Sequence, residues 1–417
     1  MSTQIGYKAS ELGMIPQDWD VVKLGDVFEV TAGGDLDVTN FSAEKTHKHI
    51  YPVYSNAITD NGLYGFSSNY DCCGNHITVT ARGYIGYAVP RNGKFSSIGR
   101  LLTLQPKTEI SCYLVAQYIN QFVSFAIEST GVPQLTAPQI KKYLVAIPKS
   151  TTEQTAIATT LSDTDALISS LQTLIAKKKA IKLSAMQNLL SGKIRLPEFA
   201  QRTDGSPKST RQTELGLLPE DWEVVELEKV AEIKSGGTPS TNRPEFWNGD
   251  ILWCTPTDIT SLSGKYLSDT NRKISELGLN NSAAELLPIG SVLMTSRATI
   301  GECAIAKRPM TTNQGFKNFI CYRTVNNEFL YYLLSSQKDK FIELCNGSTF
   351  LEISTTQVRK FKITIPKSTT EQTAIAQLLS DMDAEIEALE CRLKKTQSLK
   401  QGMMQALLTG KIRLPLE

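Results

Sequence analysis

A duplicated segment constrains the fold of this chain more than any other feature. Residues 147–197 return as residues 365–415, at a constant offset of 218 positions. The two copies share twelve consecutive residues, IPKSTTEQTAIA, and the same closing sequence, GKIRLP. A repeat of this length indicates that the chain uses one structural element twice.

Each copy is predicted to form one long helix. Ser150 followed three residues later by Glu153 is a capping-box pattern, and the second copy repeats it. Gly192 and Gly410 are predicted to stop the helices in the left-handed conformation. The interval of about 40 residues corresponds to about 60 Å of helix. Such a helix is much longer than an ordinary globular one.

Apolar residues along both predicted helices step by alternating fours and threes, which is the spacing of a coiled-coil seam. The seam residues are Ile157, Leu161, Thr164, Ile168, Leu171 and Ile175, and in the second copy Ile375, Leu379, Met382, Ile386, Leu389 and Leu393. The pattern blurs at Lys178 and Thr396 and resumes through Ile181, Ala185 and Leu189 and through Leu399, Met403 and Leu407. We therefore expect the two helices to pack on each other; separate packing on local domains is the alternative.

A second duplication opens each half of the chain. The sequence ELGMIPQDWDVV at 11–22 returns as ELGLLPEDWEVV at 214–225, at an offset of 203. Because the offset grows to 218 at the long helices, the second half gains 15 residues between the two motifs. The chain is therefore a tandem duplication. Trp19 and Trp222 are predicted to pack near the helix junctions.

The duplication divides the chain into five segments and predicts an α+β fold. Globular modules of short β-rich runs, glycine-rich turns and helical patches span 1–148 and 214–366. Predicted long helices span 149–197 and 367–417, and a polar linker spans 198–213.

Composition excludes few function classes. With 41% apolar and 21% charged residues among 417, the chain is expected to be soluble and to form more than one core. A net charge of +2 does not exclude nucleic acid, since local patches set phosphate binding. The N-terminus lacks an apolar signal core, and no apolar run reaches about 18 residues, so we expect a cytoplasmic protein without a membrane partner.

Catalytic and metal-binding motifs are missing from the sequence. It contains no GxxxxGK[ST] loop, no dinucleotide fingerprint and no Asn/Asp-Pro-Pro-aromatic tetrad. Eight cysteines without CxxC pairing are expected to be free and mostly buried. Cys72, Cys73 and His76 match no common zinc spacing, and a cysteine hydrolase built on them would have no counterpart in the second half. We expect neither catalysis, metal nor cofactor in this chain.

Four further motifs, two in each half, complete a resemblance to a known family. The second half carries SGGTPS at 235–240 and WNGDILW at 247–253, and the first carries YPVYSN at 51–56 and NGLYG at 61–65. Together with the duplicated helices and ELGxxP motifs, these residues resemble the DNA-specificity (S) subunit of type I restriction-modification enzymes. The resemblance covers essentially the whole chain.

The resemblance implies two mixed α/β target-recognition domains, at 1–148 and 214–366, separated by an antiparallel coiled coil with pseudo-two-fold symmetry. Each domain would recognise one half of an interrupted double-stranded DNA site, and helix length would set the gap. Two adenine methyltransferase (M) subunits would dock on the helices, and restriction-translocase (R) subunits would join them. Those partners would use S-adenosylmethionine, ATP and Mg²⁺.

DNA binding requires phosphate anchors and base-contacting side chains, which polar loops can supply. Our candidates are Tyr54, Ser55, Asn56, Arg82, Tyr84 and Gln134 in the first module, and Thr238, Arg243, Thr257, Arg297, Asn313, Gln314, Lys317 and Ser348 in the second. Arg82 and Arg297 could instead form structural salt bridges, and Asn313 a polar turn. Gly236 and Gly237 are expected only to shape a loop.

Two alternatives remain open from the sequence. The basic runs around Lys178 and Lys395 are predicted to be solvated helix faces, although phosphate or partner contacts are the other possibility. The competing function is a non-catalytic coiled-coil adaptor whose modules bind protein or glycan. Steeply salt-dependent binding to duplex DNA would distinguish the DNA-specificity function from the adaptor.

Overall fold

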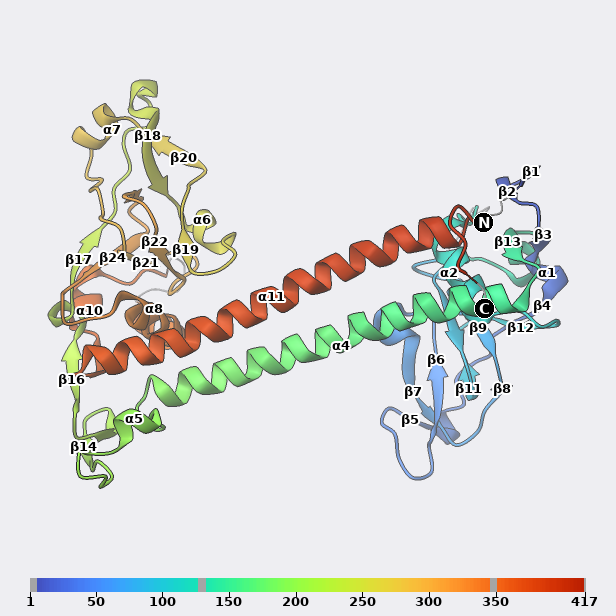
Figure 1. Ribbon diagram of the computed structural model, residues 1–417, viewed down its shortest axis with the longest axis horizontal. Helices are drawn as coiled ribbons and strands as arrows, with labels where there is room; N and C mark the ends of the chain where they lie inside the picture. Colours follow the sequence, from blue (N-terminus) through green and yellow to red (C-terminus); the bar gives the residue numbers. More distant parts are fainter. Residues whose placement is uncertain (1–5, 127–132, 346–350, 416–417) are drawn as a thin grey trace. The chain divides into compact units, whose positions relative to one another are not determined.

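The computed structural model describes residues 6–126, 133–345 and 351–415 (Figure 1). The chain divides into two compact units, one of Met1–Gln172 with Arg392–Glu417 and one of Thr173–Cys391. Each unit therefore combines one globular module with one end of each long helix. The first unit is made of two separate segments of the chain, whereas the second is one continuous segment.

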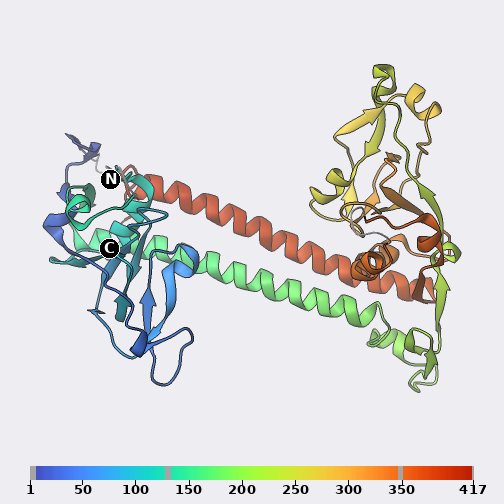
Figure 2. The ribbon, with the colours of Figure 1, turned by 180° about the vertical axis from the view of Figure 1, so that it is seen from behind.

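The two long helices are present as predicted. They are α4 (Thr151–Leu189) and α11 (Thr369–Leu407), each of 39 residues, and both run as continuous ribbons in Figures 1 and 2. Gly192 and Gly410 follow them with φ of 71° and 68°, in the left-handed conformation that favours glycine. The tandem α+β architecture is confirmed.

The predicted capping box of α4 forms only in part. The Ser150 hydroxyl accepts a hydrogen bond from the Glu153 N–H at 3.3 Å, as expected. However, both carboxylate oxygens of Glu153 accept hydrogen bonds from Arg413, beyond the end of α11. The glutamate therefore joins the two helices instead of closing the cap.

Ion pairs show that α4 and α11 run antiparallel within each unit. In the first unit the pairs are Glu153 with Arg413 and Asp165 with Lys400, the latter at 2.7 Å. In the second they are Arg195 with Glu371 at 2.6 Å and Lys182 with Asp383. As residue numbers rise along one helix, those of the partners fall along the other.

The seam is continuous, and its predicted interruption is wrong. The spacing of fours and threes passes through Lys178 and Lys182, and through Thr396 and Lys400, whereas Ile181 and Leu399 are 44% and 61% exposed. Lysine is tolerated in the seam because its long stem packs along apolar surface while its ammonium meets a carboxylate.

The basic runs are consequently not simple solvated faces. Four lysines from these runs form ion pairs between the helices: Lys178 with Glu385, Lys179 with Glu390, Lys182 with Asp383 and Lys400 with Asp165. Two of the aspartates in these pairs have a tyrosine as a second partner. Tyr113 donates a hydrogen bond to Asp165 at 2.6 Å, and Tyr332 donates one to Asp383 at 2.7 Å.

Two sheets and a helix form the first module. One sheet has the order β10-β9-β12-β4, with β4 (Phe28–Ala32), β9 (His76–Val79), β10 (Ala88–Arg91) and β12 (Leu102–Pro106). The other has the order β5-β7-β6-β11-β8, with β5 (Phe41–Ser42), β6 (Tyr51–Tyr54), β7 (Leu63–Ser67), β8 (Cys72–Cys73) and β11 (Lys94–Ser97). Helix α2 (Cys112–Phe122) packs on β9 and β10.

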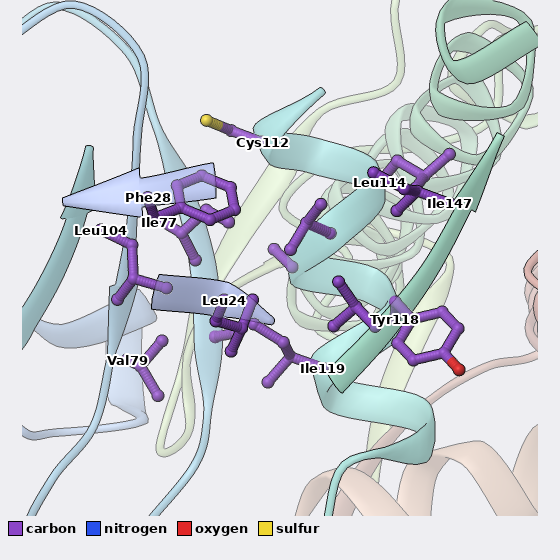
Figure 3. Close-up of a cluster of buried hydrophobic side chains, with 14 of the residues drawn as sticks. Leu24, Phe28, Ile77, Val79, Leu104, Cys112, Leu114, Tyr118, Ile119 and Ile147 are labelled. Carbon is purple, nitrogen blue, oxygen red and sulfur yellow. The ribbon is translucent and has the colours of Figure 1, made fainter. Parts of the chain in front are cut away.

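The core of the first module lies between the sheet and α2. Figure 3 shows Phe28, Ile77 and Leu104 on the strands facing Leu114 and Ile119 on the helix. The same buried cluster includes residues from the N-terminal turns of α4 and the C-terminal turns of α11. The module and the helix ends therefore share one core and should fold cooperatively.

The second module repeats this plan with different strands. One sheet has the order β17-β24-β21-β22-β19, with β17 (Ala231–Ser235), β19 (Tyr266–Leu267), β21 (Val292–Thr295), β22 (Cys303–Ala306) and β24 (Phe316–Cys321). The other has the order β20-β18-β23, with β18 (Trp247–Cys254), β20 (Arg272–Ile274) and β23 (Thr311–Thr312). Helix α8 (Asn327–Ser336) packs on β21 and β22, where α2 packs in the first module.

Short elements complete both units. The helices are α1 (Leu24–Val27), α3 (Ala137–Ile140), α5 (Pro197–Ala200), α6 (Pro256–Thr260), α7 (Glu276–Asn280), α9 (Lys338–Glu343) and α10 (Thr355–Lys360). The 3₁₀ turns are η1 (Val38–Asn40), η2 (Thr59–Gly62), η3 (Leu227–Lys229) and η4 (Pro244–Phe246). Hairpins β1 (Tyr7–Ser10) with β2 (Gly13–Pro16) and β14 (Thr210–Thr213) with β15 (Gly216–Pro219) carry the ELGxxP motifs.

A two-stranded ribbon leads into each long helix. Strand β3 (Trp19–Lys23) pairs with β13 (Leu144–Pro148), and β16 (Trp222–Glu226) pairs with β25 (Lys362–Pro366). Trp19 and Trp222 are fully buried at these junctions, as predicted.

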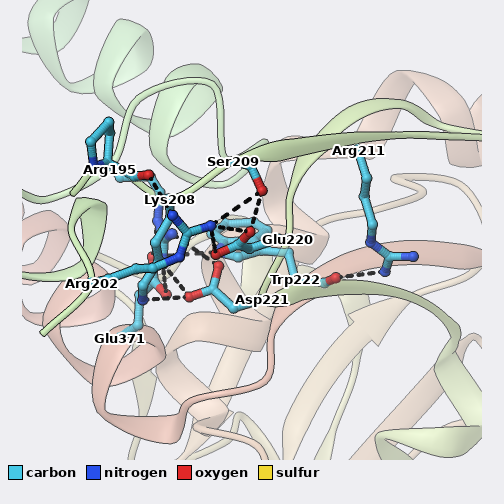
Figure 4. Close-up of polar contacts among 10 residues, drawn as sticks. Arg195, Arg202, Lys208, Ser209, Arg211, Glu220, Asp221, Trp222 and Glu371 are labelled. Carbon is cyan, nitrogen blue, oxygen red and sulfur yellow. Dashed lines mark hydrogen bonds and ion pairs between the residues drawn. The ribbon is translucent and has the colours of Figure 1, made fainter. Parts of the chain in front are cut away.

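A buried arginine ties the second junction together (Figure 4). The Arg195 guanidinium donates two hydrogen bonds to Asp221, each of 2.9 Å, and two more to Glu371. The Trp222 indole N–H also donates to Glu371, at 3.3 Å. In the first unit Arg413 likewise donates two hydrogen bonds to Asp18 and two to Glu153, but the Trp19 indole N–H has no partner among the described residues. We call these two groups the arginine clamps.

Replacing Arg195 by Met should destabilise the second unit by about 3–5 kcal/mol, because Glu371, only 1% exposed, would lose its counter-charge. Urea unfolding measures the change. Arg202→Met is the matched control, since Arg202 pairs with Glu220 at the surface and such pairs contribute little. Equal effects of the two substitutions would contradict this role of the clamp.

Acid should weaken the first clamp. Hydrogen bonds from Arg413 hold the pKa of Asp18 below its ordinary value of 3.8. A depressed pKa in the folded state contributes stability that is complete above the unfolded pKa and is lost as pH falls through the folded one. The urea midpoint should therefore decrease below about pH 4, and Arg413→Met should flatten this decrease. A parallel pH dependence in the variant would exclude the clamp as its source.

Candidate nucleic-acid interface

The same strand-and-turn unit occurs in both modules. Strands β9 and β21 lead into residues 80–87 and 295–302, which we call the frame turns. The Thr80 carbonyl accepts from Gly86 N–H at 2.8 Å, and the Thr295 carbonyl accepts from Gly301 N–H at 2.9 Å. Each threonine hydroxyl also donates to a carbonyl four residues onward. The two turns therefore have one backbone design.

Each frame turn places an arginine at the same point, followed by a residue in the left-handed conformation. Gly83 after Arg82 has φ of 68°, and Ala298 after Arg297 has φ of 58°. Left-handed backbone costs about 1–2 kcal/mol for a residue with a Cβ atom. Strained residues of this kind concentrate at functional sites.

The two arginines have different partners at one equivalent position. Arg82 donates from Nε and Nη2 to the Gln134 amide oxygen, at 3.2 and 2.9 Å. Arg297 Nη2 lies 2.9 Å from Glu352 Oε1. The salt-bridge alternative is thus correct for Arg297, whereas the first arginine keeps a neutral partner.

Asn56 ties the loops around the first frame turn. Its amide nitrogen donates to the Gly99 carbonyl at 2.6 Å, and its amide oxygen accepts from the Ala81 N–H at 2.7 Å. Both polar ends are therefore engaged within the protein. Ser55 N–H donates to the Gly62 carbonyl at 2.8 Å, and the Tyr54 ring lies under Arg91 at 3.6 Å. Tyr84, in contrast, is 64% exposed beside Arg82.

The corresponding loops of the second module also meet. Thr238 donates to the Gln314 amide oxygen, and Asn313 Oδ1 accepts from the Gly315 N–H at 2.9 Å. Asn313 thus forms the polar turn considered as its alternative. A Cβ atom at Gly236 would overlap the Asn313 carbonyl, so the glycine shapes the loop as predicted.

The remaining candidates differ in accessibility. Thr257 is exposed in α6, and Arg243 is exposed beside Glu245 at 3.7 Å. Lys317 is only 4% exposed; its ammonium donates to the Ser235 hydroxyl at 3.3 Å, and burial lowers its pKa. Ser348 lies outside the described residues.

The structure adds three arginines that sequence reasoning missed. Arg91 stacks on Tyr54, Arg272 stacks on Trp247 at 3.7 Å, and Arg100 is exposed with φ of 69°. The first two pairs join different strands or loops, so no local pattern could reveal them. The left-handed backbone of Arg100 likewise has no sequence signature.

The part of the chain that the structure describes contains all eight cysteines and all three histidines. No group of three His, Cys, Asp or Glu side chains there could hold a metal ion. Burial raises the pKa of the Cys72 thiol to about 11, and His76 packs in the core on Phe95. All eight cysteines are free, but only three are buried, fewer than expected. No described helix is long and apolar enough to cross a membrane.

Comparison with known proteins identifies the family. The type I restriction modification DNA specificity domain matches residues 16–180 and 219–397, once in each half. The chain belongs to this family. It is a DNA-specificity subunit of the type I restriction-modification class, with its recognition domain duplicated.

Relatives support this assignment over the whole chain. A putative type I restriction enzyme MjaX specificity subunit of Methanocaldococcus jannaschii is 28% identical over 440 residues, covering 98% of this chain and 97% of the relative. The MjaIX specificity subunit of that organism is 40% identical over 179 residues, which span 42% of this chain and 41% of the relative. The crystal structure of the M. genitalium S subunit shares the fold, with TM-score 0.62, 14% identity and coverage of 93% and 96%.

Backbone conformation at the frame turns gives a test. Gly83→Ala should destabilise the first unit by about 1 kcal/mol, since its φ is left-handed while the space around it is open. Gly34→Ala is the control, because Gly34 also has open space but lacks a left-handed φ. Thermal unfolding compares them. Equal stability of the two variants would mean that the frame turn relaxes without cost.

Proposed function

We propose that this chain recognises a bipartite double-stranded DNA site, each module recognising one half-site, and so directs the methyltransferase and restriction subunits of a type I enzyme. One observation carries the proposal: two frame turns of identical backbone design present an arginine within modules whose other loops differ. A common frame can place both modules on DNA in the same way, while divergent loops contact different bases.

The polar loops around each frame turn suit a DNA groove. Arginine, asparagine, glutamine and threonine side chains supply both phosphate and base-edge hydrogen bonds. In the second module Thr238, Asn313 and Gln314 belong to loops that meet at the turn, and in the first Arg82 and Gln134 lie together. Phosphate anchoring by the arginines makes binding salt-dependent.

The duplicated helices favour two copies of one partner. The twelve shared residues lead into the first turns of both helices, and the same GKIRLP sequence follows each helix, so any surface of these segments exists twice. We propose that two methyltransferase subunits dock there and that restriction subunits join them. S-adenosylmethionine, ATP and Mg²⁺ would bind those partners, leaving this chain without a cofactor or a catalytic role of its own. The complex would act in the cytoplasm.

Exchange of one module should change one half-site. The full chain, expressed with its methyltransferase subunit, is expected to direct adenine methylation at a split sequence, which sequencing of methylated DNA reports. Replacing residues 20–146 by the same region of a relative should alter only one half of that sequence. Changes in both halves would contradict modular recognition, and binding that is insensitive to salt and independent of DNA would favour an adaptor.

Helix length should set the unrecognised gap. Seven residues inserted after Thr173 and seven after Cys391 keep the seam in phase and add about 10 Å of helix, or about three base pairs. The methylated site should keep both half-sequences while its gap lengthens. Insertion in α4 alone is the control, because it would displace the ion pairs between the helices. An unchanged gap with both insertions would exclude the helices as the spacer.

A further inference from the structure

Two positions near the frame turns carry compensating charges in one module and neutral residues in the other. In the first sheet Val79 pairs with Leu102, and in the second Met294 pairs with Lys317. Val79 and Met294 each precede the threonine of a frame turn, so Lys317 occupies the position of Leu102. Glu352 likewise occupies the position of Gln134.

The equivalence of Glu352 and Gln134 rests on backbone bonds. The residue after each, Ile353 or Leu135, donates its N–H to the carbonyl of the residue before the frame arginine, at 3.1 and 2.9 Å. The first module thus combines arginine, glutamine and leucine, and the second arginine, glutamate and lysine. Both sets carry a net charge of +1.

Glu352 lies under the influence of two cations. Its carboxylate is 2.9 Å from the Arg297 guanidinium. The Lys317 ammonium approaches the same segment through Ser235, whose hydroxyl lies 3.3 Å from that ammonium and 3.1 Å from the Thr355 hydroxyl, three residues after Glu352. The charge of Glu352 accordingly opposes the effect of burial on the pKa of Lys317. Lys317 itself has a hydroxyl partner, Ser235, where the first module has Ala32. A buried ammonium is stabilised by a nearby anion and by hydrogen bonds, so the Glu352 charge favours the charged form of Lys317 alongside the Ser235 hydroxyl.

The Glu352 carboxylate affects how well Arg297 can bind a DNA phosphate. If Arg297 binds a DNA phosphate, that phosphate lies close to the Glu352 carboxylate. Repulsion between these two anions would weaken DNA binding. A second cation near the carboxylate would reduce that penalty. This repulsion is absent from the first module, because Gln134, the partner of Arg82, is neutral.

We propose that Lys317 is a positioning residue for DNA binding by the second module, because it holds the Glu352 carboxylate when Arg297 moves to a DNA phosphate. The buried lysine then acts through Glu352 and does not touch DNA itself. The inference rests on the proposed DNA-recognition function. It assigns the second module a coupling of Lys317, Glu352 and Arg297, called the relay below, which the first module lacks.

A double-substitution cycle tests the relay. The full chain with its methyltransferase subunit is compared as wild type, Lys317→Leu, Glu352→Gln and the double variant, which recreates the neutral pair of the first module. The probe is a fluorescent duplex carrying the mapped bipartite site, and anisotropy gives Kd at several salt concentrations. Lys317→Leu should weaken binding about tenfold, while the double variant should return to within about threefold of wild type. Glu352→Gln alone should bind at least as tightly as wild type.

Two controls separate the relay from a folding defect. Urea unfolding of each variant reports stability, and a duplex with only the first half-site intact should bind Lys317→Leu and wild type equally. Gln134→Glu is the matched variant of the first module, since it adds a carboxylate beside Arg82 where Leu102 offers no cation. It should weaken binding about tenfold and act through the first half-site.

The outcomes discriminate clearly. A double variant as weak as Lys317→Leu would mean that the lysine acts without Glu352, and unchanged binding of all variants would mean that no coupling exists; either overturns the inference. If the wild-type complex fails to bind the bipartite duplex, the proposed function itself fails, whatever the variants do.

Discussion

The buried carboxylate at the first turn of each long helix is the constraint on which the rest of the structure depends. Glu153 and Glu371 are almost inaccessible, and a buried carboxylate is strongly destabilising without a cation. Arg413 and Arg195, from the GKIRLP segment after the opposite helix, supply that cation. Each clamp therefore joins the start of one helix, the end of the other and the tryptophan strand, which are the segments that the duplication repeats.

The clamps also set the register of the helix pair within each unit. With the helix ends joined, Lys400 meets Asp165 in one unit and Lys182 meets Asp383 in the other. These pairs place charge inside a mainly apolar seam. Polar residues in a coiled-coil seam favour one register over others, at some cost in stability. Here Tyr113 and Tyr332 each donate a further hydrogen bond to the aspartate of the pair, so its carboxylate has a second partner.

The modules combine a fixed frame with variable surroundings. Thr80 and Thr295 make the same hydrogen bonds, and the following arginines leave the strand at the same point. The sheets beyond the frame differ in the length and number of their strands, and the partners of the arginines differ in charge. The shared frame turn fixes where the surrounding loops begin, while differences in the loop residues change the polar groups that these loops present. This division suits a family whose members share an architecture.

Sequence alone determined the tandem duplication, the long helices with their glycine stops, the buried tryptophans at the junctions and the family. These features are local patterns or exact repeats, so neighbouring residues carry the whole signal. Tertiary structure decided that Lys182 and Lys400 lie in the seam, that Asn56 ties loops together and that Lys317 is buried beside Ser235. Each of these depends on the register between segments distant in the chain, and the energy of a charged or polar side chain depends on which partner that register brings to it.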